Sequence, residues 1–314
     1  MERATEQVKR SCRRVVELSK CVKIDEAKLR VFAGGIANKP VYLKYFDFED
    51  HIGIDSELRT VVAFVFLVDC TNFCFWPSDW EYDNLCRAIK QAMLKKPQYA
   101  EPSFLADALT FEEFNKDIFD GKVYPLAMER FRAFKEVGRV IVDHFNGDFL
   151  LILERANNDA ETLLEIVVTL FLKFQDHCIY EGEQVFFYKR AQILVGDLFG
   201  ALQQKGGPLQ IKDVGRLTCF ADYRIPQILR AHEILVYSDE LSKIVDGRSE
   251  LHYGSTQEVE IRAAMIHTVE LLKAELESLG VCWTSVEIDW LLWQVGEQKK
   301  DEIKPHHRTL SIFY

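Results

Sequence analysis

Proline and glycine are scarce in this sequence, with 8 and 16 among 314 residues. Long flexible linkers are built from Gly, Ser and Pro, so none is expected here. Long apolar runs are also missing: the best candidate, Val61 to Val68, is much shorter than the roughly 20 residues that a membrane-spanning helix needs. The first residues show no apolar signal core either. We therefore expect a cytoplasmic protein with no membrane span.

Positive charge is in deficit, with 39 Lys and Arg against 49 Asp and Glu and a net charge of −10. A protein that binds duplex nucleic acid needs several Lys or Arg on the phosphates, so this balance argues against such a partner and allows a small ligand. Hydrophobic residues make up 48% of the chain and charged residues 28%. This composition is typical of a globular chain with one large domain or two closely packed ones.

Paired metal-binding motifs are absent. The 8 cysteines are scattered without C-x-x-C spacing, which predicts free thiols in a reducing compartment. Cys70 and Cys74 are four residues apart, but no His follows at zinc-finger spacing. The sequence also lacks a P-loop, a G-x-G-x-x-G and a G-x-S-x-G motif. We expect no metal and no cofactor.

Apolar residues recur at three- and four-residue spacing along most of the chain, which is typical of amphipathic helices. Capping-box sequences begin at Thr110, Ser255 and Thr284, and Gly280 follows the longest periodic stretch. The apolar segment 58–70 fits a helix or a buried strand. We predict helices over residues 4–22, 25–32, 83–95, 126–145, 160–174, 184–202, 256–279 and 284–293. The fold class is therefore predicted to be all-α.

The segment 215–230, GRLTCFADYRIPQILR, combines a carboxylate, a phenol and a guanidinium just before a predicted helix. Pro226 suits a first helical turn, because its fixed φ fits and its missing N–H costs nothing there. Asp222 then lies at the positive end of that helix. Asp is also a favoured N-cap residue, and on spacing alone capping is the favoured role.

Other residues are candidates for ligand contacts. In the segment TNFCFWP, Asn72 can donate and accept hydrogen bonds and Trp76 has a flat ring, which suits a planar heterocycle; an aromatic corner of the core is an equally good interpretation. His51 lies in a predicted loop, where ligand contacts concentrate. Lys189 and Arg190 lie inside a predicted helix and either face solvent or bind a phosphate.

The end of the chain carries two further acids. Glu287 is explained as the acid of a capping box, whereas Asp289 has no such explanation. The tail 306–314 ends in aromatic residues, which predicts docking rather than fraying. The stretch 40–50 is aromatic and irregular, with Tyr42, Tyr45, Phe46 and Phe48.

Several segments taken together resemble the queuosine salvage family, the queuosine 5′-phosphate N-glycosylase/hydrolase group. They are TNFCFWP, FYKRAQILVGDL, LTCFADYRIPQILR, EIRAAMIHTVELL, VEIDWLLW and HHRTLSIFY. The similarity runs from about residue 30 to residue 314. It implies a single compact all-α domain over residues 1–314, akin to helix-hairpin-helix DNA glycosylases, with residues 1–30 as an N-terminal helix. It also implies release of queuine from queuosine 5′-phosphate, for salvage into tRNA.

The resemblance changes the balance for Asp222, which we now expect to be catalytic. Residue chemistry assigns the remaining candidates to parts of this substrate. Base and sugar contacts are predicted for His51, Asn72, Trp76, Phe220, Glu287 and Asp289; phosphate contacts are predicted for Lys189, Arg190, Tyr223 and Arg224. The competing hypotheses are a non-catalytic modified-base or tRNA-associated binding protein, and a DNA glycosylase. The oligomeric state is left open.

Overall fold

A computed structural model describes residues 2–37, 49–53 and 55–314. Tyr42, Tyr45, Phe46 and Phe48 of the aromatic stretch lie outside the described residues. The α-helices are α1 (Ala4–Leu18), α2 (Glu26–Ala37), α3 (Leu58–Asp69), α4 (Tyr82–Lys95), α5 (Phe111–Phe119), α6 (Ala127–Phe145), α7 (Leu150–Arg155), α8 (Ala160–Leu170), α9 (Lys189–Lys205), α10 (Arg224–Ala231), α11 (Asp239–Asp246), α12 (Thr256–Ser278) and α13 (Ser285–Lys299). Short helical turns cover Pro97–Ala100, Phe104–Ala108, Leu172–Phe174 and Val214–Arg216.

The strands within the described residues form two small antiparallel pairs. β1 (Val22–Ile24) pairs with β4 (Leu235–Tyr237), and β2 (His177–Tyr180) pairs with β3 (Glu183–Phe186). The protein is therefore mostly all-α, which confirms the predicted fold class.

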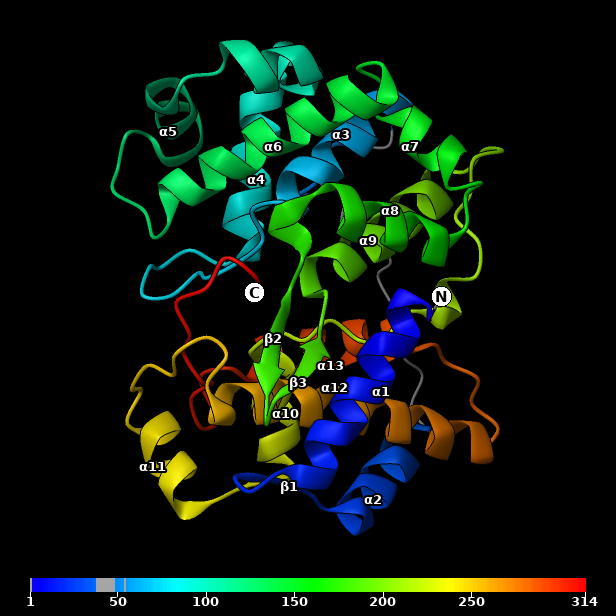
Figure 1. The fold of residues 1–314 in the computed structure, drawn as a ribbon, viewed down its shortest axis with the longest axis vertical. Coiled ribbons are helices and arrows are strands. Elements are labelled where there is room, and N and C mark those ends of the chain that lie inside the picture. The colour runs from blue at the N-terminus through cyan, green and yellow to red at the C-terminus, as the bar shows by residue number, and fades with distance from the viewer. Residues whose placement is uncertain (1, 38–48, 54) are drawn as a thin grey trace.

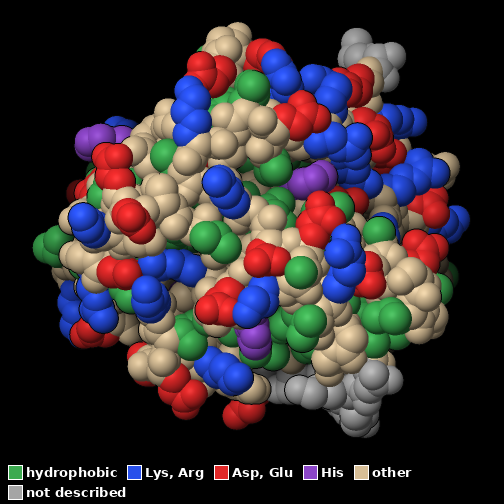
Figure 2. Space-filling view, turned by 90° about the horizontal axis from the view of Figure 1, so that it is seen from below, with side chains coloured by type: hydrophobic (Ala, Val, Ile, Leu, Met, Phe, Trp, Pro, Cys, Tyr) green, Lys and Arg blue, Asp and Glu red, His purple; other side chains and the backbone are tan. Residues whose placement is uncertain are grey.

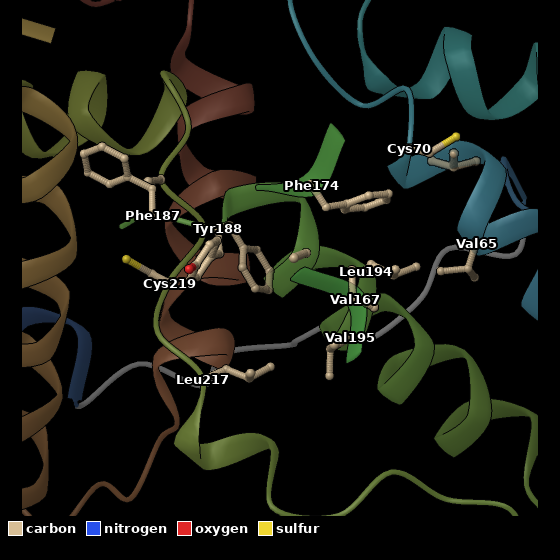
Figure 3. Close-up of a cluster of buried hydrophobic side chains, with 14 of the residues drawn as sticks. Val65, Cys70, Val167, Phe174, Phe187, Tyr188, Leu194, Val195, Leu217 and Cys219 are labelled. Atoms are coloured by element: carbon tan, nitrogen blue, oxygen red, sulfur yellow. The ribbon is translucent and has the colours of Figure 1, made fainter. Parts of the chain in front are cut away.

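The helices form two groups in space (Figure 1). Helices α3 to α8 lie in the upper part of that view, while α1, α2 and α10 to α13 lie in the lower part. Helix α9 packs on α3 and α8, and also contacts the turn Val214–Arg216. Figure 3 shows Leu194 and Val195 of α9 between Val65 of α3 and the segment that carries Leu217 and Cys219. Because α9 is apolar toward both groups, it joins them into one core.

The segment 58–70 is a helix, which resolves the two interpretations that its apolar sequence allowed. Every residue of α3 from Val61 to Asp69 is buried. An apolar helix without a polar face is typical of a central position in the core.

The predicted helix over residues 184–202 is wrong at its start. Residues Glu183–Phe186 form β3, and α9 begins only at Lys189. The cause is the turn between β2 and β3, where Glu181 and Gly182 both have positive φ, +48° and +82°. Two consecutive positive φ values suit a tight hairpin, so local turn geometry overrides the helical spacing. In the same way α1 ends at Leu18, before β1, instead of reaching residue 22.

The predicted capping signals are largely confirmed, but the helix predicted over residues 160–174 ends earlier, at Leu170. The Thr110 side chain accepts from the Glu113 N–H, and Thr284 and Glu287 form a complete capping box. At Ser255 half of the box is present, because the Glu258 carboxylate accepts from the Gly254 N–H instead. Helix α12 ends at Ser278, and Gly280 follows with φ +84°.

The surface carries mixed charge. Figure 2 shows Lys and Arg interspersed with Asp and Glu on the face seen from below. Among the described residues, no helix is both long enough and apolar enough to cross a membrane. The 8 cysteines are free, and five of them are buried.

Candidate active site

A cavity of about 390 Å³ opens where the two groups of helices meet. Two helices present rows of side chains to it at four-residue spacing. Helix α9 contributes Lys189, Ile193 and Asp197, and helix α13 contributes Asp289, Trp293 and Glu297. Residues at i and i+4 share one face of a helix, so each row is a single stripe. Asp197, Trp293 and Glu297 were not among the predicted site residues, although this spacing was available as a signal.

Asp222 lines the cavity and also caps a helix. Its Oδ1 accepts from the N–H groups of Arg224 (3.1 Å) and Ile225 (3.0 Å), at the start of α10. The N–H of Phe220 donates to Oδ1 of Asp289 at 2.7 Å, and this bond holds the backbone just before Asp222 against α13. The two roles considered from the sequence are therefore compatible, because a cap uses one carboxylate oxygen and leaves the side chain at the cavity wall.

Buried charge is concentrated around the ammonium of Lys189. Burial raises the pKa of Asp222, while Lys189 and the N–H groups of α10 act in the opposite direction. The pKa of Asp289 is raised well above its ordinary value by burial and by the charge of Asp222. Burial lowers the pKa of Lys189, and the nearby carboxylates of Asp222 and Asp69 oppose that shift. Since Asp222 receives the stronger support for its charged form, we assign the negative charge of the Asp222–Asp289 pair to Asp222.

A hydrogen-bonded chain crosses the cavity wall from His51 to Asp197. His51 Nε2 lies 3.1 Å from the hydroxyl of Tyr82, and that hydroxyl donates to Asp197 Oδ2 at 3.2 Å. Burial raises the pKa of Asp197 to about 7, against the lowering effects of Tyr82 and Lys189. Asp197 can therefore exchange a proton near neutral pH.

This shift gives a testable dependence of stability on pH. Below about pH 4 the Asp197 carboxyl is protonated in both states; between that value and about pH 7 only the folded protein keeps the proton. The parent accordingly loses stability as pH rises through this window, whereas Asp197→Asn has no such proton to lose. We expect the stability of the variant relative to the parent to rise by at most ~3 kcal/mol between about pH 5 and about pH 8, because about two pH units of the window are crossed at about 1.36 kcal/mol each. Urea unfolding at both pH values measures the difference, and a pH-independent difference would contradict the assignment.

Two buried arginines hold the segment that carries Asn72. Arg130 donates to the carbonyls of Thr71, Phe73 and Cys74, and its guanidinium lies 4.2 Å from the Phe73 ring centroid. Arg190 donates to the carbonyls of Cys70 and Lys173. The backbone turn so fixed presents Asn72, Phe73 and Phe75 to the cavity.

Seven of the predicted site residues line this cavity: His51, Asn72, Lys189, Phe220, Asp222, Tyr223 and Asp289. They come from five separate parts of the chain, and the fold brings them together. Asn72 donates to Asp69 Oδ1 at 3.4 Å, and its carbonyl accepts from Lys189 Nζ at 3.3 Å. The ring of Tyr223 packs on His306 with centroids 4.3 Å apart.

Four predicted site residues are not among the described residues that line the cavity: Trp76, Arg190, Glu287 and Arg224. Trp76 donates to the Thr309 carbonyl at 3.1 Å, and Glu287 closes the capping box of α13. Arg190 is 1% exposed with its guanidinium on backbone carbonyls. Arg224 lies behind the wall, where it pairs with Glu297 at 2.6 Å. Arg190, Glu287 and Arg224 thus have structural partners for the charged groups that were proposed to bind substrate, and the indole N–H of Trp76 is used by Thr309.

The cavity wall is aromatic and acidic. Rings of Phe73, Phe75, Tyr82, Trp290 and Trp293 line it, in addition to those of Phe220, Tyr223 and Tyr314. Such walls suit a flat, partly cationic ligand, since the rings provide stacking faces and the carboxylates attract positive charge. Within the described residues, no group of three or more His, Cys, Asp or Glu is arranged to hold a metal ion.

Comparison with known proteins adds an independent finding. Residues 52–314 match the family model described as queuosine salvage protein. Three relatives bear the name queuosine 5′-phosphate N-glycosylase/hydrolase. The protein from Dictyostelium discoideum is 43% identical over 273 residues, covering 85% of this chain and 82% of the relative. The Sphaerobacter thermophilus protein is 37% identical and covers 96% of both chains, and the Mus musculus protein is 35% identical and covers 82% of both.

Proposed function

The chain belongs to the queuosine salvage protein family, and on this premise we propose that it is an N-glycosidase that hydrolyses queuosine 5′-phosphate. The products are queuine, which is salvaged into tRNA, and ribose 5-phosphate. The observation that supports this assignment best is the carboxylate of Asp222, which lines an aromatic cavity and whose charged form is favoured by the buried ammonium of Lys189.

Asp222 is the proposed catalytic residue. When the bond between C1′ and the base nitrogen breaks, its electron pair leaves with the base and C1′ develops oxocarbenium character. A fixed carboxylate close to C1′ stabilises that positive charge. Water then supplies the oxygen of the new C1′–O bond, and the proton that it loses replaces the one taken up by the leaving base. Direct attack by Asp222 and electrostatic stabilisation place the same demand on the side chain, which is to be ionised and to face C1′.

The leaving base needs help of another kind. Queuine is a 7-deazaguanine, so position 7 is carbon and cannot accept a proton in the way a purine does. The departing negative charge must spread into the pyrimidine half of the base. Asp289 and Asp197 both line the cavity. Burial raises the pKa of Asp197 to about 7 and raises the pKa of Asp289 well above its ordinary value, which favours the protonated form of both carboxyls as proton donors. We assign them to the base, together with His51 and Asn72.

The wall offers partners for the remaining parts of the substrate. Phe220 provides a stacking face, as do Phe73 and Trp293. Other acids of the wall, such as Glu81 and Glu297, can pair with the secondary ammonium of queuosine and accept hydrogen bonds from its cyclopentenediol. For the 5′-phosphate we retain Lys189 and Tyr223, which line the cavity.

We further propose that residues 1–314 form one domain. Glu260 of α12 accepts from Ser19 Oγ and from the Cys21 N–H, both at 2.6 Å, and from the Tyr180 hydroxyl at 2.8 Å. Helix α1 packs along α12. The N-terminal helix is therefore part of the common core. The free cysteines favour a reducing compartment, which supports a cytoplasmic location.

A queuine-release assay on the purified protein tests the proposed function. We expect queuine and ribose 5-phosphate in equal amounts from queuosine 5′-phosphate, with the same rate in EDTA because the proposed chemistry uses carboxylates and water. A binding protein would retain the substrate without releasing queuine. Abasic sites in duplex DNA would indicate a DNA glycosylase instead, and either result would contradict the proposal.

A further inference from the structure

Arg262 of α12 is fully buried and contacts acidic, aromatic and backbone groups. It is not one of the described residues that line the cavity. Its guanidinium binds both carboxylate oxygens of Asp176, at 3.1 and 2.5 Å, and lies 3.4 Å from Glu258. The rings of Phe187 and Tyr314 pack against it, with both centroids 4.0 Å from Cζ. The planar guanidinium is therefore fixed in position and in orientation.

One N–H of Arg262 points to the catalytic segment. Nε donates to the carbonyl of Ala221 at 3.1 Å. Ala221 directly precedes Asp222, and Phe220 before it is held by Asp289 at 2.7 Å. Side chains of two helices thus hold the backbone that precedes Asp222. Asp289 of α13 accepts from the N–H of Phe220, and Arg262 of α12 donates to the carbonyl of Ala221.

Asp176, the partner of Arg262, holds the start of α9. Its Oδ2 accepts from the backbone N–H of Lys189 at 3.2 Å. Its backbone carbonyl accepts from the N–H groups of Phe187 and Tyr188, at 3.0 and 3.1 Å. Lys189 is the first residue of α9, and its ammonium supports the charge of Asp222. The same carboxylate therefore contacts Arg262 and the backbone of Lys189.

We propose that Asp176 and Arg262 form a positioning pair that sets the Lys189 ammonium and the Asp222 carboxylate in their catalytic geometry. The connection runs from the Lys189 N–H through Asp176 and Arg262 to the Ala221 carbonyl. Each link is buried, so water does not compete with the hydrogen bonds. The inference rests on the proposed function, because it explains how the site of that reaction is built.

Stability alone does not account for this arrangement. Burying two charges costs desolvation free energy, and hydrophobic side chains of similar volume often give an equally stable core. A guanidinium can serve a carboxylate and a carbonyl at once through its fork of donors, whereas an ammonium is a point charge. A displacement of about 1 Å at a reacting group can cost roughly 10²-fold in rate, so the geometry has a catalytic value that packing cannot replace.

The test is the steady-state kinetics of Arg262→Lys and Asp176→Asn with queuosine 5′-phosphate. Lys keeps the charge but cannot reach Asp176 and the Ala221 carbonyl together, and Asn keeps the shape of Asp176 but weakens the pairing. We expect kcat to fall by about 10²-fold in each variant, with KM within about threefold of the parent. The matched control is Arg230→Lys, because Arg230 also forms a bidentate pair, with Asp246 at 2.7 and 3.1 Å, and lies 4.7 Å from the ring of Tyr237. Its kcat should stay within about twofold of the parent.

Far-UV circular dichroism and thermal melting identify the folded variants, and the milder Asp176→Asn covers the case in which Arg262→Lys does not fold. Folded variants with parental kcat would overturn the inference while leaving the proposed function intact. An equal loss in Arg230→Lys would also overturn it, because the effect would then be one of general stability. A parent that releases no queuine would overturn the proposed function and this inference together.

Discussion

Asp222→Asn lowers kcat for queuosine 5′-phosphate by about 10²–10³-fold, with little change in KM, if its charge acts on the transition state. The reason is electrostatic. The Asn side chain keeps an oxygen that can accept from the N–H groups of Arg224 and Ile225, so the start of α10 is preserved. What is lost is the negative charge at the cavity wall. Single-turnover release of queuine measures the chemical step directly.

The matched control is Asp159→Asn. Asp159 caps α8 in the same way, with Oδ1 accepting from the Thr162 N–H at 2.8 Å. Because Asp159 is not one of the described residues lining the cavity, the same chemical change should leave kcat within about twofold. Parental turnover by Asp222→Asn would remove the catalytic role of Asp222, and a similar loss in both variants would reduce the effect to helix capping.

Lys189→Met is the second large effect that we expect, at about 10²-fold in kcat/KM. Lys189 lowers the pKa of Asp222, and its removal should raise that pKa even though Arg224 remains nearby. The active form needs an ionised Asp222, so the acidic limb of the pH–rate profile should move to higher pH. Rates across a pH series for parent and variant measure the shift. The limb would stay in place if Lys189 had no electrostatic contact with Asp222.

Comparison of two substrates separates two roles of Lys189. If its ammonium also contacts the 5′-phosphate, the loss in kcat/KM is larger for queuosine 5′-phosphate than for queuosine. An equal loss for both would assign Lys189 to Asp222 alone. Lys96→Met is the control, because it removes a lysine ammonium that is paired with two carboxylates, Glu113 and Asp117, at 2.7 Å each and is not one of the described residues lining the cavity. It should leave the kinetics of both substrates unchanged.

The sequence predicted the individual helices well because their signals are local. The three- and four-residue spacing of apolar residues, the capping box at Thr284 and the glycine after α12 each act within a few residues of the chain. The same local information failed at residues 183–186, where a hairpin turn that depends on only two residues replaces the start of a helix. A helical spacing of apolar residues does not exclude a short strand.

Lys189 and Arg190 show how far the sequence alone can predict the residues of the site. Neighbouring cations in a helix are usually exposed, yet both are buried here. The charge of Lys189 is supported above all by Asp222, in the segment before α10, and Arg190 donates to the carbonyls of Cys70 and Lys173. These partners are distant in the sequence, so spacing along α9 cannot indicate which of the two cations reaches the cavity. Trp76 and Phe73 differ in the same way, since only the fold of the turn decides which of the two rings lines the cavity.

By itself, the sequence determined the helical character of the chain, the place of Asp222 at the start of a helix and, through its motifs, the family. The tertiary structure decided which residues share the cavity, and it added Asp197, Tyr82 and Trp293 to the predicted set. Helical periodicity indicates which face of a helix is buried, but not which other helix meets that face. Burial of charge depends on that meeting, because a carboxylate or ammonium is tolerated in the core only where a distant segment supplies its partner.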